Sequence, residues 1–238
     1  MFRKLRRALF PPSGYNISRY GPALSADHVR QAWLLKHGVN TVIDVGANNG
    51  QYGRELRKFG YRGRIVSYEP LSEAFAALKN ACAADHQWSA HQLALGPQSG
   101  NAEINVAANS WSSSLLAMLP KHLESAPESA YVGTEQVRVS TLDEQCDAQS
   151  IDPSLAFLKI DAQGYTVPIF EGGQQTLQRL RGVQVEMSLV PLYAEEILIE
   201  DVMARLRAAG LQPVLIKPEF TDRLSGQQLQ VDGIFLRL

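Results

Sequence analysis

Three acidic residues, each close to the end of a short apolar stretch, have the types and spacing best suited to chemistry. Asp44 lies within the apolar run 41–45, Glu69 follows the run 65–68, and Asp161 ends the run 155–161. The first acid is followed directly by a loop of small residues, Gly46-Ala47-Asn48-Asn49-Gly50, and then by a helix-like segment. An apolar strand, a tight glycine-containing turn and a helix are typical of the nucleotide pocket of a parallel sheet.

The loop at 46–50 indicates which nucleotides could bind. It has neither the Gly-x-Gly-x-x-Gly spacing of a dinucleotide site nor a Gly-x-x-x-x-Gly-Lys-Ser/Thr triphosphate loop. Asp44 would repel a phosphate but would suit a cationic amino group. S-adenosylmethionine fits this pattern, because it carries an ammonium, a sulfonium and a ribose but no phosphate. The alternative is an ordinary strand–turn–helix corner that uses small residues for tight geometry.

Glu69 stands at the tip of the next predicted strand, where a carboxylate can accept hydrogen bonds from the two hydroxyls of a ribose. Asn48 is expected to orient the loop backbone and to contact the cofactor. Asp44, the loop 46–50 and Glu69 lie at about the spacing expected within one strand–helix–strand unit. The predicted cofactor-binding residues are Asp44, Gly46, Asn48, Gly50 and Glu69.

Alternating hydrophobic patterns predict an α/β fold with a largely parallel sheet and helices on both faces. The last two strands are expected to form an antiparallel pair. Ligands of such sheets bind at the carboxyl ends of the strands, where the three acids should converge. The expected helices cover 26–37, 51–59, 71–84, 168–180 and 194–209, the expected strands 41–45, 64–68, 88–95, 155–161, 183–187, 212–216 and 231–236, and two short extra strands 102–107 and 136–139.

The polar loop 109–114 and the stretch that follows it to about residue 133 form a candidate substrate loop or lid. Trp111 could stack on the face of a sugar or could anchor its own loop. Glu186, within a predicted buried strand, needs a partner because burying a carboxylate is costly. It is interpreted as a structural hydrogen-bonding group or as a substrate contact.

Composition limits the class of protein. The 238 residues are 45% hydrophobic, enough for one sizeable core, and the net charge of −1 provides no general attraction for nucleic acid. Two isolated cysteines indicate a reducing, cytoplasmic setting, and the five histidines lack metal-ligand spacing. No apolar run is long enough to span a bilayer.

Residues 1–25 are predicted to be a lead-in segment before a domain at 26–238, and their basic cluster could touch a membrane surface weakly or be a frayed tail.

Several motifs together resemble the FkbM-type S-adenosylmethionine-dependent methyltransferases. They include VIDVGANNGQY at 42–52, SYEP at 67–70, FLKIDAQGY at 157–165, VQVEMSLVPLY at 183–193 and LQVDGIF at 229–235, and they cover roughly residues 39–237 in order. The resemblance implies a Rossmann-like seven-stranded methyltransferase sheet with a small β insertion. It also implies methylation of a hydroxyl on a sugar, glycan or secondary metabolite.

One position departs from the family's pattern, which usually has Glu where this chain has Gln163. The change removes a negative charge near the predicted centre and weakens the case for a metal held by paired carboxylates, so no metal site is predicted. Asp161 is then the predicted catalytic residue, as a base for the acceptor hydroxyl or as the group that positions it. An alternative role for Asp161 is to bind the amino group of the methionine moiety.

Two other functions remain open from the sequence. One is a protein of the methyltransferase fold that binds the cofactor without turnover, for which Gln163 gives limited support. The other is an NAD-dependent oxidoreductase, which the loop spacing at 46–50 disfavours.

Overall fold

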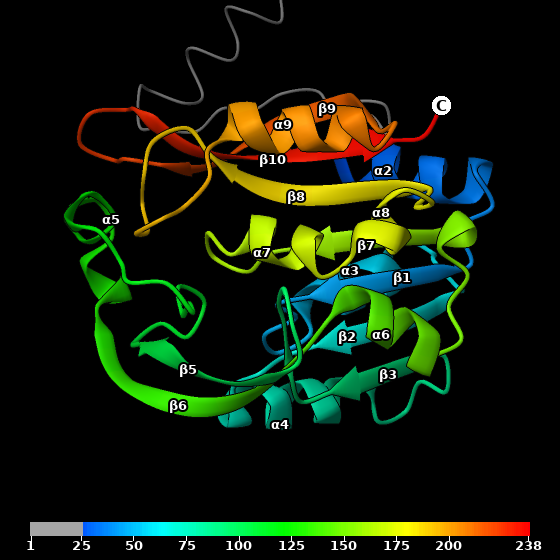
Figure 1. Ribbon diagram of the computed structural model, residues 1–238, viewed down its shortest axis with the longest axis horizontal. Coiled ribbons are helices and arrows are strands. Elements are labelled where there is room, and N and C mark those ends of the chain that lie inside the picture. The colour runs from blue at the N-terminus through cyan, green and yellow to red at the C-terminus, as the bar shows by residue number, and fades with distance from the viewer. Residues whose placement is uncertain (1–25) are drawn as a thin grey trace, which may run out of the picture.

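The computed structural model describes residues 26–238 and contains two sheets (Figure 1). The larger has seven strands in the order β3-β2-β1-β7-β8-β10-β9. Its first five strands run parallel, whereas β10 is antiparallel to both of its neighbours. The strands are β1 (Thr41–Val45), β2 (Arg64–Tyr68), β3 (Trp88–His91), β7 (Ala156–Ile160), β8 (Gly182–Ser188), β9 (Gln212–Thr221) and β10 (Gln228–Leu236). The predicted α/β fold and the antiparallel pair at the end of the chain are confirmed.

Helices cover both faces of this sheet because the central strands are apolar on both sides. Along β1, Ile43 and Val45 pack with α6–α9, whereas Val42 packs on the opposite face with α2–α4. The helices are α2 (Ala26–Lys36), α3 (Gln51–Lys58), α4 (Ser72–Cys82), α5 (Pro120–Ser125), α6 (Leu142–Ala148), α7 (Thr166–Glu171), α8 (Gln174–Leu177) and α9 (Ile199–Ala208).

The smaller sheet has the order β4-β6-β5 and contains β4 (Ala94–Leu95), β5 (Gly100–Ala107) and β6 (Tyr131–Ser140). Figure 1 shows β5 and β6 curving away from the larger sheet. The expectation of one strand over 88–95 is wrong, since β3 joins the large sheet and β4 pairs with β6. Ile104 and Val137 of this sheet pack against Leu71 and Ala74 at the start of α4, which places the insertion beside the carboxyl end of β2.

Two predicted helices differ from the structure for a common reason: side-chain groups compete with the helix for backbone hydrogens. The expected helix 168–180 is divided into α7 and α8, and the Asp143 carboxylate caps α8 by accepting the N–H groups of Gln175 (3.1 Å) and Thr176 (2.8 Å). The expected helix 194–209 begins only at Ile199. Before it, the Glu196 carboxylate accepts the N–H groups of Leu192 and Tyr193, which fixes a loop.

The predicted lead-in segment and its basic cluster lie outside the described residues, so the division at residue 25 stays a prediction. Within residues 26–238, no helix combines the length and apolar character needed to cross a membrane. Cys82 and Cys146 are both buried and free.

Candidate active site

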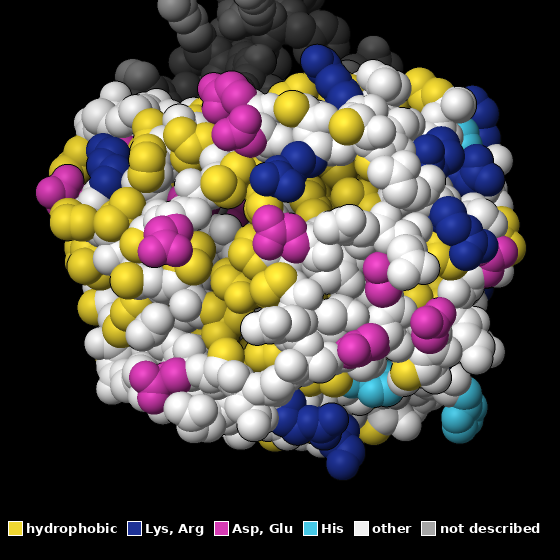
Figure 2. All heavy atoms as spheres, viewed as in Figure 1, with side chains coloured by type: hydrophobic (Ala, Val, Ile, Leu, Met, Phe, Trp, Pro, Cys, Tyr) yellow, Lys and Arg dark blue, Asp and Glu magenta, His cyan; other side chains and the backbone are white. Residues whose placement is uncertain are grey.

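A cavity of about 410 Å³ lies at the carboxyl ends of β1, β2 and β7. Figure 2 shows the surface hollowed near the centre of the view, with apolar side chains inside and charged side chains at the border. One part of the cavity lining is apolar, formed by Leu71, Leu93, Leu95, Ile104 and Leu115. Another part is charged, formed by Asp27, Arg30, Glu55, Lys217 and Glu219. Gly46, Glu69 and Asp161, from the ends of the three strands, also line the cavity, so the expected convergence is partly realised.

Glu69 is buried, with 4% of its surface exposed, and both of its oxygens accept backbone hydrogen bonds. Oε2 accepts the N–H of Asn48 (2.8 Å), and Oε1 accepts the N–H of Leu71 (2.9 Å). Burial raises the pKa of Glu69 to about 7, although these two bonds oppose the shift. The carboxylate therefore holds the loop after β1 against the end of β2 and can change its charge near neutral pH.

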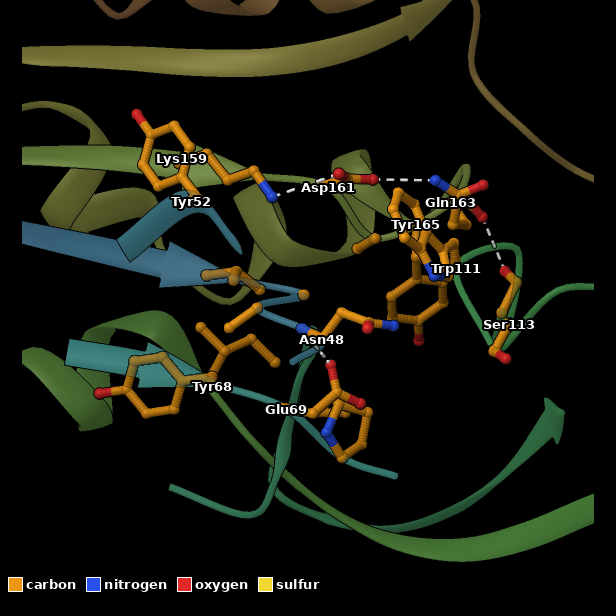
Figure 3. Close-up of a pocket in the computed structure, with 18 of the residues that line it drawn as sticks. Asn48, Tyr52, Tyr68, Glu69, Trp111, Ser113, Lys159, Asp161, Gln163 and Tyr165 are labelled. Atoms are coloured by element: carbon orange, nitrogen blue, oxygen red, sulfur yellow. Dashed lines mark hydrogen bonds and ion pairs between the residues drawn. The ribbon is translucent and has the colours of Figure 1, made fainter. Parts of the chain in front are cut away.

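Asn48 connects two loops at the border of the cavity. Its backbone has a positive φ of 46°, which is uncommon for a residue other than glycine. Its side-chain Nδ2 donates to Ser110 Oγ (3.3 Å), and Ser110 itself has a φ of 54°. Figure 3 shows Asn48 between Glu69 and Trp111, so the structure places this predicted residue at the cavity.

Gly46 permits the ends of β1 and β7 to approach each other. Its φ is +73°, and a Cβ at this position would lie 1.8 Å from the carbonyl oxygen of Asp161. Gly50 differs, because it does not line the cavity. It precedes α3 with a φ of +85°, and a Cβ there would lie 3.1–3.2 Å from Leu78 and Trp88. Of the two glycines predicted to contact the cofactor, only Gly46 borders the cavity.

Asp44 is fully buried and does not line the cavity. Ser67 Oγ donates to its Oδ2 (3.0 Å), and Lys159 Nζ lies 3.8 Å from its Oδ1. Burial raises the pKa of Asp44, although Lys159 and Ser67 act in the opposite direction. In the structure Asp44 contacts an internal lysine, and its contact with a cofactor amino group stays a prediction.

Lys159 connects this buried acid to the cavity. Its Nζ lies 3.2 Å from Asp161 Oδ2 and 5.4 Å from the centre of the Tyr52 ring (Figure 3). Burial disfavours the charged ammonium, but the carboxylates of Asp161 and Asp44 outweigh burial and raise the pKa of Lys159. Lys159 therefore remains charged and fixes one oxygen of Asp161.

Gln163 fixes the other oxygen of Asp161. Its Nε2 donates to Asp161 Oδ1 (2.8 Å) and to Glu186 Oε2 (3.2 Å), while its Oε1 accepts from the Tyr193 hydroxyl (2.7 Å). Gln230 Nε2 also donates to Glu186 Oε2 (2.9 Å). Burial, followed by the Asp161 charge, raises the pKa of Glu186 well above its usual range. One amide thus bridges two carboxyl groups that would otherwise repel each other.

Several cavity residues were not predicted from the sequence, including Arg30, Tyr52 and Lys159. The sequence did contain a signal for Lys159, because a charged residue is unusual inside an apolar run such as 155–161. Arg30 and Tyr52 resemble ordinary helix residues, and only the packing of α2 and α3 brings them to the cavity. Among residues 26–238, no group of three or more His, Cys, Asp or Glu side chains is arranged to hold a metal ion.

The sequence profile described as "Methyltransferase FkbM domain" matches residues 44–213, which is more than half of the chain. The chain therefore belongs to the FkbM methyltransferase family and is an S-adenosylmethionine-dependent methyltransferase with a Rossmann-like fold. Membership of this family rules out the alternative hypothesis that the protein is an NAD-dependent oxidoreductase.

Individual relatives are distant. The chain is 22% identical over 176 residues to "2-O-methyltransferase NoeI" of Sinorhizobium fredii (strain NBRC 101917 / NGR234), covering 71% of this chain and 72% of that protein. Among solved structures, a TehB-like SAM-dependent methyltransferase from Corynebacterium glutamicum is 12% identical, with a TM-score of 0.41 and coverage of 100% of this chain and 95% of that one. An rRNA methylase from Streptococcus thermophilus is 10% identical, with a TM-score of 0.47 and coverage of 93% and 99%, respectively.

The composition of the cavity fits the cofactor that the family implies. Among residues 26–238, five carboxyl groups and three basic side chains line it, which favours a ligand with net positive charge. S-adenosylmethionine has such a charge when its sulfonium and ammonium are counted against its carboxylate. The apolar lining suits an adenine ring, and the volume lies within the range of about 300–1,000 Å³ usual for small-molecule sites.

The close approach at Gly46 gives a stability prediction. Gly46→Ala should lower the free energy of unfolding by about 2–3 kcal/mol more than Gly38→Ala, because the new methyl group collides with the Asp161 backbone. Gly38 is a matched control, since its φ is +65° but a Cβ there would meet nothing within 4 Å. Urea denaturation of both variants measures the difference. Equal losses would show that only backbone strain matters at Gly46.

Proposed function

We propose that this protein transfers the methyl group of S-adenosylmethionine to a hydroxyl of a sugar, glycan or secondary metabolite. The observation that carries the proposal is the meeting of Gly46, Glu69 and Asp161 at one cavity in a chain of the FkbM family. The name of the distant relative, a 2-O-methyltransferase, supports an oxygen acceptor. That the acceptor is not a nucleic acid, and that the protein acts in the cytoplasm, stay predictions from composition.

The cavity suggests how the cofactor lies. The apolar part beside Leu71 and Ile104 would hold the adenine, and the Glu69 carboxylate would accept hydrogen bonds from the ribose hydroxyls. The charged part of the cavity would hold the methionine moiety, and Gly46 also lines the cavity. Asn48 supports this placement by holding the loop backbone against Glu69.

The bound cofactor supplies a methyl group that its sulfonium has already activated. Asp161 holds the acceptor hydroxyl in line with that group and accepts its proton. Lys159 and Gln163 orient the carboxylate, each through a different oxygen. Positioning of this kind is worth roughly 7–11 kcal/mol in well-oriented reactions, and a general base adds about 10²–10⁴-fold.

Trp111 supplies an acceptor surface at the border of the cavity, where 63% of the residue is exposed. Its loop is held rigidly by hydrogen bonds on both sides. Asn109 Nδ2 donates to Ser112 Oγ and Ser129 Oγ (both 3.1 Å), and Asn48 holds Ser110. An exposed aromatic side chain on a loop held in this way can stack on the apolar face of a sugar at a low cost in conformational entropy.

Cofactor affinity should depend on pH through Glu69. The ionised carboxylate accepts hydrogen bonds from the ribose hydroxyls. The affinity for the cofactor should therefore be highest above the pKa of about 7 and should decline as the pH falls below it. If only the ionised form binds, affinity should be about tenfold lower at pH 6 than at pH 8. Calorimetry at both pH values measures this change. Glu69→Gln should weaken binding and remove this component of the pH dependence; an unchanged pH profile would contradict the role of Glu69.

Stability of the free protein should show the opposite trend. Because burial raises the pKa of Glu69 from 4.5 to about 7, the native state binds more protons than the unfolded state between these values. The contribution of Glu69 to the free energy of unfolding should therefore decline as the pH rises through this range. The difference between wild type and Glu69→Gln isolates the contribution.

Asp161→Asn keeps the shape of the side chain but removes its charge. It should lower turnover by about 10²-fold or more, with a far smaller change in cofactor affinity. Turnover is measured as S-adenosylhomocysteine formed with a panel of methyl glycosides and hydroxylated metabolites, and binding by calorimetry. A large loss of affinity would instead assign Asp161 to the methionine amino group. Cofactor binding without turnover on any acceptor of the panel would contradict the proposed acceptor class.

Transfer is expected to be independent of a metal, because the Gln163 amide already lies between the carboxyl groups of Asp161 and Glu186. Activity should therefore persist in EDTA. Loss of activity that magnesium or manganese restores would overturn this part of the proposal.

Trp111→Ala should raise the KM for a sugar acceptor by about 10-fold, in line with aromatic anchors in other binding sites, and should leave cofactor affinity unchanged. Trp111→Phe should retain most of the affinity because it keeps an aromatic face. Trp33 is a matched control, since it packs against the core cluster formed by α2–α4 and does not line the cavity. A weaker cofactor complex with an unchanged acceptor KM would place Trp111 over the cofactor.

A further inference from the structure

Arg30 brings a cation to the charged part of the cavity from α2, outside the region that the family profile matches. The residue is 3% exposed, and its guanidinium carbon lies 4.7 Å from the centre of the Tyr52 ring. A long basic side chain is buried to this extent only when the fold holds it in place. Arg30 is therefore a fixed part of the cavity wall.

The hydrogen bonds of Arg30 leave part of its guanidinium free. Nη2 donates to the Glu55 carboxylate, and Nη1 lies 3.4 Å from both Gln184 Oε1 and Asp27 Oδ1. Nε is buried and, among the described residues, has no hydrogen-bond partner. Because Nε has almost no exposed surface, a ligand in the cavity would bind Nη1, whose two contacts of 3.4 Å are long for hydrogen bonds and leave it capacity to donate.

The neighbouring groups match an amino acid that carries both charges. The guanidinium offers a planar pair of donors suited to a carboxylate. The side chains of Asp27 and Glu55 are 34% and 38% exposed, so they can turn toward water or face a ligand ammonium. The methionine moiety of the cofactor has such a zwitterionic end. With the ribose at Glu69, that end would lie in the charged part of the same cavity, where Arg30 is.

The two other basic groups of the cavity have less capacity for a carboxylate. Lys159 lies between Asp161 and Asp44, and its Nζ is engaged by both. Lys217 Nζ lies 2.9 Å from Glu219 and 3.3 Å from Asp232. Of these three bases among the described residues, Arg30 has the most buried side chain, and its Nη1 makes only contacts of 3.4 Å.

We propose that Arg30 binds the α-carboxylate of the methionine moiety of S-adenosylmethionine. This inference rests on the proposed function, because it requires the cofactor to lie in the cavity with its ribose at Glu69. Arg30 is then a binding residue, which sets affinity for the cofactor and discriminates against ligands that lack the carboxylate.

The test compares two ligands that differ only in this group, S-adenosylmethionine and decarboxylated S-adenosylmethionine, by calorimetry. For Arg30→Met, the Kd of S-adenosylmethionine should rise by about 10- to 100-fold relative to wild type, whereas the Kd of the decarboxylated ligand should change less than threefold. Lys217→Met is the matched control, since it removes another cation from the same cavity. It should leave the ratio of the two Kd values close to that of wild type.

Arg30→Lys provides a second variant that keeps the charge but lacks the planar donor pair, and it should lose an intermediate share of the discrimination. The ratio of the two Kd values within one variant does not depend on a general loss of stability. An unchanged ratio in both Arg30 variants, or a ratio that changes only in Lys217→Met, would overturn the inference while leaving the proposed function intact. Failure of the wild-type protein to bind either ligand would overturn both.

Discussion

The carboxyl ends of β1 and β7 approach so closely at Gly46 that a Cβ there would lie 1.8 Å from the carbonyl oxygen of Asp161. This approach places the loop after β1 and the acid after β7 next to each other in the lining of the cavity. Glu69 then anchors the same loop from β2 through the N–H of Asn48. Three strand ends are thereby fixed relative to one another, and the cavity follows from their arrangement.

Next to the cavity the protein buries a connected set of charged side chains. Asp44, Lys159 and Asp161 alternate in sign, and Ser67 joins the set by donating to Asp44. Burying charges is costly, and such ion pairs seldom add net stability. Their effect here is geometric, because Lys159 and the Gln163 amide leave Asp161 little freedom to rotate. A carboxylate held in this way can position an acceptor without a metal ion to orient it.

The two ends of the cavity depend on different parts of the chain. The apolar end is completed by Ile104 and Leu115 of the inserted segment, and the charged end by α2, α3 and β9. The family profile covers the inserted segment and α3 but leaves out α2 and nearly all of β9. The proposed acceptor site depends on the loop around Trp111. Loops change more readily than the sheet that supports them, so one cofactor site can be combined with different acceptor sites.

The sequence by itself determined the succession of strands and helices, the position of Glu69 and Asp161 at strand ends, and the family. These features depend on local periodicity and on motifs that are continuous in the chain. Gly46 was also identified, although the structure gives it a steric role against the Asp161 backbone. Lys159 could have been noticed as a charge within an apolar run.

Only the tertiary structure decided that Asp44 is buried beneath the cavity, that Gly50 lies away from it, and that Arg30 and Tyr52 border it. It also decided the division between α7 and α8, since the Asp143 carboxylate that caps α8 comes from another helix. In each case the determining contact joins residues distant in the chain. Such contacts leave no periodic signal in the sequence, because their energy depends on which elements pack together in the folded protein.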